Sequence, residues 1–304
     1  MICVLGDVML DKYSFGKIER ISPEAPVPVI SVLEEKYALG GAANVANNLI
    51  SLKEDVYLLG LNNNGSNLGK KVISLCEKSG IKTFFVNDNR PTTLKHRFIA
   101  RDYNQQVLRA DYEDKTPLSY EYSKKLVDKI LELNPKILII SDYGKGVITQ
   151  KLMENLKRGY TGKILVDPKP KNVDLYKDVY LLKPNLNEAS NILGEKLKNE
   201  DSKLEEAVKE LMSKYHSNVL ITRGSRGSTL STLNGNIYHI PAEKREVYDV
   251  SGAGDTFLAT IAYALNHDYS LLDAVELATR ASSIVVGKVG TATVTLDELF
   301  NKDE

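Results

Sequence analysis

Short apolar runs alternate with amphipathic stretches along most of this 304-residue chain. A continuous apolar run rich in β-branched residues predicts a strand buried on both faces, whereas apolar residues at helical spacing, with charge opposite, predict a helix. The predicted strands are ICVLG (2–6), VYLLGL (56–61), ILIISD (137–142), ILVDP (164–168), VYLLKPN (179–185) and NVLITRG (218–224). The clearest predicted helices are 119–133, 203–215 and 253–266. This alternation predicts an α/β fold with a mostly parallel sheet covered by helices on both faces, whose ligands bind beyond the carboxyl ends of the strands.

Two segments depart from this rhythm. Residues 12–39 hold three of the ten prolines and the alternating PVPVISV, which is typical of edge strands, and residues 92–113 alternate in a similar way. We expect the two segments to form a small β-sheet that projects from the main domain, either as a lid over the site or as a dimer contact surface. No linker, repeat or charge block marks a second domain, so residues 1–304 are predicted to form one domain.

The composition narrows the function classes. Lys and Arg number 40 and Asp and Glu number 40, so no net positive field favours nucleic acid or an anionic membrane. Cys3 and Cys76 lie in apolar segments and are expected to be reduced core residues, and the four histidines lack zinc-ligand spacing. The sequence shows neither a secretory leader nor an apolar run long enough to span a membrane, so we expect a soluble, cytoplasmic protein.

The most informative stretch is EVYDVSGAGDT, residues 246–256. We expect the strand-like EVYDV to run into a helix, which places the backbone N–H groups of Gly252, Ala253 and Gly254 near a helix N-terminus, where anions bind. Asp255 in the first turn has an ordinary explanation as a partner of the helix dipole. An acid beside an anion-binding turn is also the minimum equipment for phosphoryl transfer, because it supplies a base for the acceptor hydroxyl and donors for the moving phosphoryl group.

Other phosphate-binding signatures are missing from the sequence. It contains no G-x-x-x-x-G-K-[ST], no protein-kinase H-R-D with D-F-G, and no G-x-G-x-x-G after the first strand. The sequence therefore disfavours a P-loop ATP site, a protein-kinase ATP site and the function of a dinucleotide-dependent oxidoreductase.

Motifs spread over essentially the full chain carry a family resemblance. The segments DVSGAGDT, GGAANVANNL, PNLNEA and TRGSRG together resemble the PfkB, or ribokinase-like, sugar kinases. Within that family, the blocks RISPEAPVPV, GGAANVA, NQQVLRAD, SDYGKG, VDPK, EVYDVSGAGDT and VVGKVGTATV are similar to the kinases of D-glycero-β-D-manno-heptose 7-phosphate. The resemblance implies a ribokinase-like fold with a small β-sheet lid. It also implies ATP-dependent phosphorylation of the anomeric C1 hydroxyl to the 1,7-bisphosphate, a step toward the ADP-heptose of lipopolysaccharide or surface glycan.

The resemblance also assigns roles on the nucleotide side of the site. Asp255 becomes the catalytic base, and Gly252, Ala253 and Gly254 become the anion hole for the transferring phosphate. Asn185 and Glu188 organise Mg²⁺ and the ATP phosphates, partly through water, although a first-turn acid of a helix is the ordinary explanation for Glu188. The residues expected along the nucleotide are Thr222, Gly224, Gly227 and Ser282, the last within 282–287 on the final helix. Asp249 and Ser251 match a monovalent-cation site in relatives, so K⁺ is a further expected ion.

Sugar recognition is expected from the N-terminal half. Asp11 accepts hydrogen bonds from hydroxyls, Gly40 and Gly41 permit close approach, and Asn44 offers an amide, although a helix beginning near Ala42 explains the same residues. The candidate cations for the phosphate already on the substrate are Lys95, Arg97, Arg109, Lys145 and Lys169, and Asp142 beside them is counted with the substrate-binding residues.

Alternatives stay open at this stage. The acceptor could be another sugar phosphate, such as a fructose or tagatose phosphate, or the protein could bind nucleotide and sugar phosphate without chemistry. A small-molecule sugar phosphate is the expected partner, together with a second copy of the chain through the lid. The sequence ends at Glu304, without the nucleotidyltransferase half of many relatives, and leaves open whether the kinase stands alone.

Overall fold

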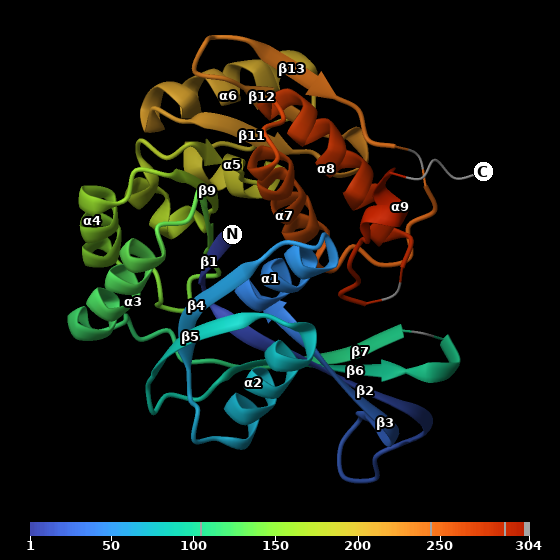
Figure 1. Ribbon diagram of the computed structural model, residues 1–304. Helices are drawn as coiled ribbons and strands as arrows, with labels where there is room; N and C mark the ends of the chain where they lie inside the picture. Colours follow the sequence, from blue (N-terminus) through green and yellow to red (C-terminus); the bar gives the residue numbers. More distant parts are fainter. Residues whose placement is uncertain (104, 244, 289, 301–304) are drawn as a thin grey trace.

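The computed structural model describes residues 1–103, 105–243, 245–288 and 290–300; Asn104, inside the second expected lid segment, lies outside them. Within these ranges the chain forms a nine-stranded main sheet and a four-stranded small sheet (Figure 1). The main-sheet strands, in spatial order, are β13 (Ile237–Ile240), β12 (Ser228–Ser231), β11 (Asn218–Thr222), β10 (Leu181–Leu182), β9 (Lys163–Asp167), β8 (Ile137–Ser141), β1 (Ile2–Gly6), β4 (Val56–Asn62) and β5 (Lys82–Asn87).

Neighbouring strands run parallel along the sheet from β11 through β10, β9, β8, β1 and β4 to β5. At the opposite edge, β12 pairs antiparallel with β11 and with β13. From β1 the chain moves outward to β4 and β5, and then crosses to the other side through β8 and β9. The order therefore reverses between β1 and β8, and in parallel sheets the carboxyl ends of strands at such a switch point hold the ligand. Gly6 allows the two strands to meet closely here, because a Cβ on it would lie 2.1 Å from the Ser141 carbonyl oxygen.

Helices cover both faces of the main sheet, as the sequence predicts. The helices are α1 (Ala42–Ser51), α2 (Asn67–Ser79), α3 (Tyr120–Leu133), α4 (Gln150–Gly159), α5 (Leu186–Leu193), α6 (Asp201–Tyr215), α7 (Ala253–Asn266), α8 (Leu271–Val286) and α9 (Leu296–Phe300), with short 3₁₀ turns at Arg101–Tyr103, Pro170–Tyr176 and Gly224–Arg226. One core packs α1, α2, α7 and α8 against one face of the sheet, and a second core packs α3 to α6 against the other. Alternate residues of β1 enter opposite cores, Ile2 and Val4 in the first and Cys3 and Leu5 in the second, which explains its uninterrupted apolar sequence.

The two segments that depart from the helical rhythm form the small sheet, which projects from the main body beside α2 (Figure 1). Its strands, in spatial order, are β3 (Pro28–Gly41), β2 (Val8–Ile21), β6 (Thr93–Ala100) and β7 (Gln105–Tyr112). The proline-containing β3 is an edge strand, as expected, but the residues before it form β2, an inner strand paired on both sides. The first expected segment therefore contributes one edge and one inner strand.

Three further local expectations differ from the structure. EVYDV is an irregular loop rather than a strand, because the N–H groups of Tyr248 and Asp249 bond to the Val286 carbonyl at the end of α8 and not to a neighbouring strand. Strand β10 shrinks to two residues because Pro184, which has no N–H, soon follows it. Finally, α8 is followed by α9, so Ser282 does not lie on the final helix. No helix in the described part of the chain is long and apolar enough to cross a bilayer.

Candidate active site

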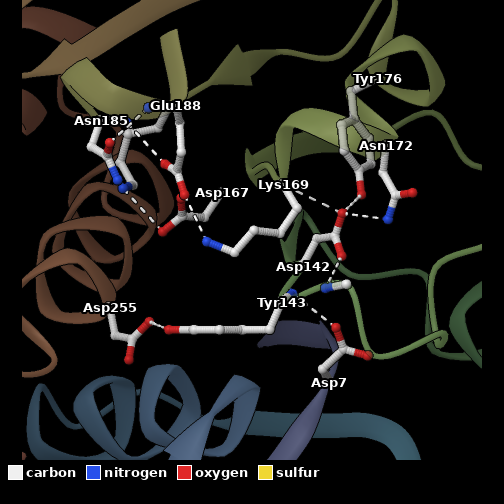
Figure 2. Close-up of polar contacts among 12 residues, drawn as sticks. Asp7, Asp142, Tyr143, Asp167, Lys169, Asn172, Tyr176, Asn185, Glu188 and Asp255 are labelled. Atoms are coloured by element: carbon white, nitrogen blue, oxygen red, sulfur yellow. Dashed lines mark hydrogen bonds and ion pairs between the residues drawn. The ribbon is translucent and has the colours of Figure 1, made fainter. Parts of the chain in front are cut away.

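Polar side chains gather where adjacent strands of the main sheet end. Asp7 follows β1, Asp142 follows β8, Asp167 closes β9 and Lys183 follows β10, so the parallel strands deliver all four to the same edge. Asp255, in the first turn of α7, faces this row from across the edge (Figure 2). The convergence matches the position that the reversal in strand order predicts for a ligand site.

Asp255 is buried, with 6% of the residue exposed, and each of its carboxylate oxygens accepts a hydrogen bond. The Asn44 amide of α1 donates to Oδ2 at 2.8 Å, and the Tyr143 hydroxyl donates to Oδ1 at 2.9 Å. The pKa of Asp255 is raised to about 6, chiefly by burial, while the two donors and the ammonium group of Lys183 oppose the shift. Near neutral pH the carboxylate is thus ionised and basic enough to accept a proton from an alcohol during reaction.

The turn before α7 presents backbone donors beside that carboxylate. Gly252 has φ +80°, and a Cβ there would meet the Asn44 amide nitrogen at 2.8 Å, so the tight turn needs glycine. Among the described residues, the N–H groups of Gly252, Gly254 and Asp255 have no acceptor. The Ala253 N–H instead bonds to the Val250 carbonyl at 3.3 Å. Of the three donors expected, Gly252 and Gly254 are therefore free within the described ranges and Ala253 is not, while Asp255 adds its own N–H. Such donors at a helix N-terminus are able to bind an anion.

Ser282, expected along the nucleotide, lies on α8 beside the first turn of α7. Its hydroxyl donates to the Ala253 carbonyl at 3.1 Å, which ties α8 to the first residue of α7. Asp249 joins the loop before α7 to the segment after α8, because its two carboxylate oxygens accept the N–H groups of Ser251 and Gly290 at 2.8 and 3.0 Å. The expected K⁺ residues thus lie in the loop that leads into the turn.

Two buried carboxylates fix the loop that carries Tyr143. Asp7 accepts the backbone N–H groups of Tyr143, Lys145 and Val147 at 2.8, 3.0 and 3.3 Å. Burial, with the nearby charge of Asp142, raises the pKa of Asp7 to about 6, although the three N–H groups oppose the shift.

Asp142 is the second of these carboxylates. It accepts from the N–H of Gly144 and from the side chains of Asn172 and Tyr176 at 2.8, 2.9 and 2.7 Å. Asp142, expected among the substrate-binding residues, therefore also supports this loop from within.

Two ion pairs lie between this loop and α5. Lys183, only 2% exposed, pairs with Asp167 at 3.0 Å, and an added Cβ on Gly254 would lie 3.8 Å from its ammonium nitrogen. Lys169 pairs with Glu188 at 2.7 Å (Figure 2). Lys169, expected among the phosphate-binding cations of the sugar, is therefore held on the Glu188 side of the site.

Asn185 and Glu188 form a reciprocal capping box at the start of α5, with N–H to side-chain distances of 2.9 and 3.0 Å. The ordinary explanation for Glu188 as a first-turn acid is thus correct, and its remaining oxygen still faces Lys169. The backbone of Thr222, at the end of β11, pairs with that of Asn185 in an isolated parallel β-bridge, which brings two of the expected nucleotide residues together. Gly224 and Gly227 shape the turn after β11, where both have positive φ.

The donor set fits a metal ion that is held mainly by phosphate and water. In the chain as described, no group of three His, Cys, Asp or Glu residues is arranged to hold a metal. The available carboxylates, Asp167 and Glu188, are each paired with a lysine. Mg²⁺ retains several waters and is often bound through substrate phosphates, so this set suits it without an all-protein cage.

The small sheet contributes a second polar group next to Asp255. Arg97 of β6 pairs with the buried Asp11 of β2, and an added Cβ on Gly40 would lie 2.5 Å from an Asp11 oxygen. Lys95, also on β6, lies near both Asp11 and Asp255; burial lowers its pKa, while these two carboxylates raise it. Asn44 and Lys95, both expected for sugar recognition, thus lie next to Asp255.

The other expected cations lie further out. Arg109 of β7 is directly opposite Arg97, so it shares the face of the sheet, but it is about half exposed and binds Asp111 of its own strand. Lys145 pairs with Glu113 where β7 leads toward α3.

Several residues of the site are absent from the sequence-based assignments: Asp7, Tyr143, Asp167 and Lys183. Each lies at or just after the end of a predicted strand, so applying the strand-end rule to every strand would have selected them. Tyr143 and Asp167 also lie within the motifs SDYGKG and VDPK.

Comparison with known proteins agrees with this geometry. The protein is similar to bifunctional protein HldE from Aliarcobacter butzleri strain RM4018, with 43% identity, and from Helicobacter pylori strain 26695, with 42% identity. Each alignment covers 98% of this chain but only 63% and 65% of the relative. The chain thus spans slightly less than two thirds of the curated relatives it matches.

Solved structures share the fold at low sequence identity. Phosphofructokinase-2 from Escherichia coli, in complex with potassium, has a TM-score of 0.84 and 18% identity over 98% of this chain and 96% of that one. Ribokinase from Thermotoga maritima has a TM-score of 0.77 and 20% identity over 98% and 97%. These likenesses confirm the predicted ribokinase-like fold. The model of the pfkB family carbohydrate kinases matches residues 1–298, so this chain belongs to the pfkB family of carbohydrate kinases.

Proposed function

We propose that this carbohydrate kinase transfers the γ-phosphoryl group of ATP to the C1 hydroxyl of D-glycero-β-D-manno-heptose 7-phosphate, giving the 1,7-bisphosphate and ADP. The observation that carries the proposal is Asp255, a buried carboxylate with a raised pKa beside the free N–H groups of the turn before α7. The heptose assignment rests on the motif blocks and on the similarity to HldE over nearly the whole chain. The product would feed ADP-heptose synthesis for lipopolysaccharide or surface glycan.

The residues suggest a balanced reaction step. Asp255 takes the proton as the C1 oxygen forms a bond to the γ-phosphorus, and the bond from that phosphorus to the β–γ bridging oxygen breaks to release ADP. The N–H groups of Gly252 and Gly254 and the ammonium group of Lys183 stabilise negative charge on the moving phosphoryl. Mg²⁺, when bound, would neutralise phosphate charge near Asn185 and Glu188, while K⁺ beside Asp249 and Ser251 is a further proposal.

The small sheet is proposed to serve as lid and dimer surface, within a single domain that works in the cytoplasm. Lys95 lies on its inner part and near Asp255, where a cover would exclude water that hydrolyses ATP. Its outer part exposes several large apolar side chains: Ile21, Val32, Leu33 and Leu108 are 63%, 44%, 57% and 57% exposed. A hollow of about 340 Å³, lined partly by Gly16, Ile18 and Val107, lies on the same part. A second copy of the chain is the proposed occupant.

Replacing Asp255 tests the chemistry. We expect Asp255→Asn to lower kcat by about 10²- to 10⁴-fold, the usual contribution of a positioned base. Because the pKa of Asp255 is raised in the folded state, its ionised form disfavours folding above pH 6, so the variant should be at least as stable as wild type at pH 7.

For the wild type, kcat should fall as pH drops through about 6, where Asp255 gains a proton. The rates are measured from ADP release, and thermal melting checks that the Asp255→Asn variant is folded. Undiminished turnover in a folded variant would contradict the assignment.

The acceptor is tested with a substrate panel. We expect ADP release with heptose 7-phosphate to exceed that with fructose 1-phosphate, fructose 6-phosphate, tagatose 6-phosphate and ribose, and mass spectrometry to detect the bisphosphate. Preference for a hexose phosphate would replace the heptose assignment while leaving the kinase intact. Tight binding of nucleotide and sugar phosphate in calorimetry, with no product, would instead favour a binding protein without chemistry.

The cations of the sugar side are tested by affinity. Arg97→Ala and Lys145→Ala should each raise KM for the sugar phosphate about tenfold or more while kcat changes less, because charge-assisted contacts to phosphate are lost. Lys82→Ala is the matched control, since Lys82 is an exposed lysine paired with Asp55. An unchanged KM in both site variants would remove these residues from the phosphate site.

The dimer is tested by sedimentation. Wild type should sediment as a dimer, and a variant with Leu33→Asp and Leu108→Asp should sediment as a monomer, because charge disfavours an apolar interface. Leu233→Asp is the control, because Leu233 is also 57% exposed but lies between β12 and β13 of the main sheet. A monomeric wild type would exclude the proposed contact.

A further inference from the structure

Tyr143 lies between the catalytic carboxylate and two lysines from different parts of the fold. Its hydroxyl is 2.9 Å from Asp255 Oδ1, and its ring centroid is 4.7 Å from the Lys95 ammonium nitrogen and 5.5 Å from that of Lys169. Lys95 belongs to the small sheet, whereas Lys169 follows β9 and pairs with Glu188. The hydroxyl of Tyr143 thus contacts the proposed base, while its ring lies between a lysine of the proposed sugar side and a lysine of the proposed nucleotide side.

The direction of the hydrogen bond is fixed by chemistry. Desolvation of the hydroxyl and the negative charges of Asp255 and Asp167 raise the pKa of Tyr143 well above its ordinary value. The hydroxyl therefore keeps its proton and donates to the ionised Asp255. Together with the Asn44 amide on Oδ2, it holds both carboxylate oxygens, and each oxygen retains a second lone pair for the acceptor hydroxyl.

The backbone beneath Tyr143 is rigidly held. Its own N–H bonds to Asp7, and the N–H of the next residue, Gly144, bonds to Asp142 (Figure 2). Both carboxylates are buried at the ends of the adjacent strands β1 and β8. The ring therefore projects from a support set by the main sheet, while Asp255 is carried by α7.

The geometry points to Tyr143 as the positioning residue of the catalytic base: its hydroxyl orients Asp255 and keeps it in the ionised form, against the burial that favours protonation. This role rests on the proposed function of Asp255. It differs from simple packing because it acts through the hydrogen bond that the hydroxyl donates to Asp255 Oδ1. The charged and titratable groups that also face Asp255 are Lys183 and Asp167 from the main sheet and Lys95 from the small sheet.

Removing the hydroxyl is the first test. With a sugar phosphate that the wild type accepts, Tyr143→Phe should lower kcat about 10- to 100-fold, the range expected for a hydrogen bond to a charged group, and change KM for ATP and sugar much less. The acid limb of the kcat–pH profile should move to higher pH, because Asp255 loses a donor to its ionised form. A kcat within twofold of wild type and an unmoved acid limb would overturn the proposal.

Two other tyrosines separate this effect from damage to the structure. Tyr160→Phe is a remote control, because the hydroxyl of the buried Tyr160 donates to the Pro135 carbonyl, and it should leave kcat and the acid limb unchanged. Tyr176→Phe removes a donor from Asp142 in the same loop, so it should leave the acid limb in place even where it lowers kcat. An acid limb that moves equally in Tyr176→Phe would assign the effect to the loop and overturn the specific role of Tyr143.

A second measurement keeps the ring and changes only the strength of the donor. Site-specific 3-fluorotyrosine at position 143 has a more acidic hydroxyl, so the acid limb should move to lower pH, opposite to Tyr143→Phe. An unmoved limb would overturn the proposal even where the Phe variant folds poorly. The two proposals fail in different ways. If the proposed function of Asp255 is wrong, Asp255→Asn retains turnover. If Asp255→Asn is inactive but Tyr143→Phe behaves as the wild type, only the positioning role of Tyr143 is overturned.

Discussion

The site depends on keeping one negative charge ionised in a place that excludes water. Asp255 is buried in the first turn of α7, and burial alone would favour its neutral form. Donors from Asn44 and Tyr143, with the ammonium group of Lys183 nearby, oppose this and leave the pKa at about 6. A carboxylate balanced in this way is charged at neutral pH and still basic enough to receive a proton, which a fully solvated aspartate near its ordinary pKa does less well.

The rest of the site balances further charges around that carboxylate. Asp7 and Asp142 are satisfied by backbone and side-chain donors of the loop that follows β8, and so they serve the shape of the protein. Asp167 and Glu188 are instead paired with Lys183 and Lys169. Cations and anions thus alternate between α7 and α5, where the phosphates of a nucleotide would meet both free N–H groups and ammonium groups.

The main sheet explains why these groups meet. The order of the strands reverses between β1 and β8, and the loop after β8, held by Asp7 at the end of β1, carries Tyr143 to Asp255. The small sheet then adds Asp11, Lys95 and Arg97 from a separate layer. Asp255 is therefore carried by α7 and contacted by α1 and by the loop after β8, while the small sheet supplies the neighbouring cations.

Much of this follows from local sequence. The apolar runs predict the central strands because residues buried on both faces must all be apolar, and the helix over 253–266 has the predicted bounds. Asp255 and the glycines beside it are recognisable for the same local reason, since a tight turn and a helix N-terminus are properties of adjacent residues. Tertiary contacts alone decided the rest: EVYDV has strand-like residues but no neighbouring strand, and Lys169 turns to Glu188 because α5 begins beside it. Likewise, Tyr143 reaches Asp255 across 112 positions of the chain. Periodicity reports which side of an element is buried, whereas the partner of a polar side chain depends on which elements the fold brings together.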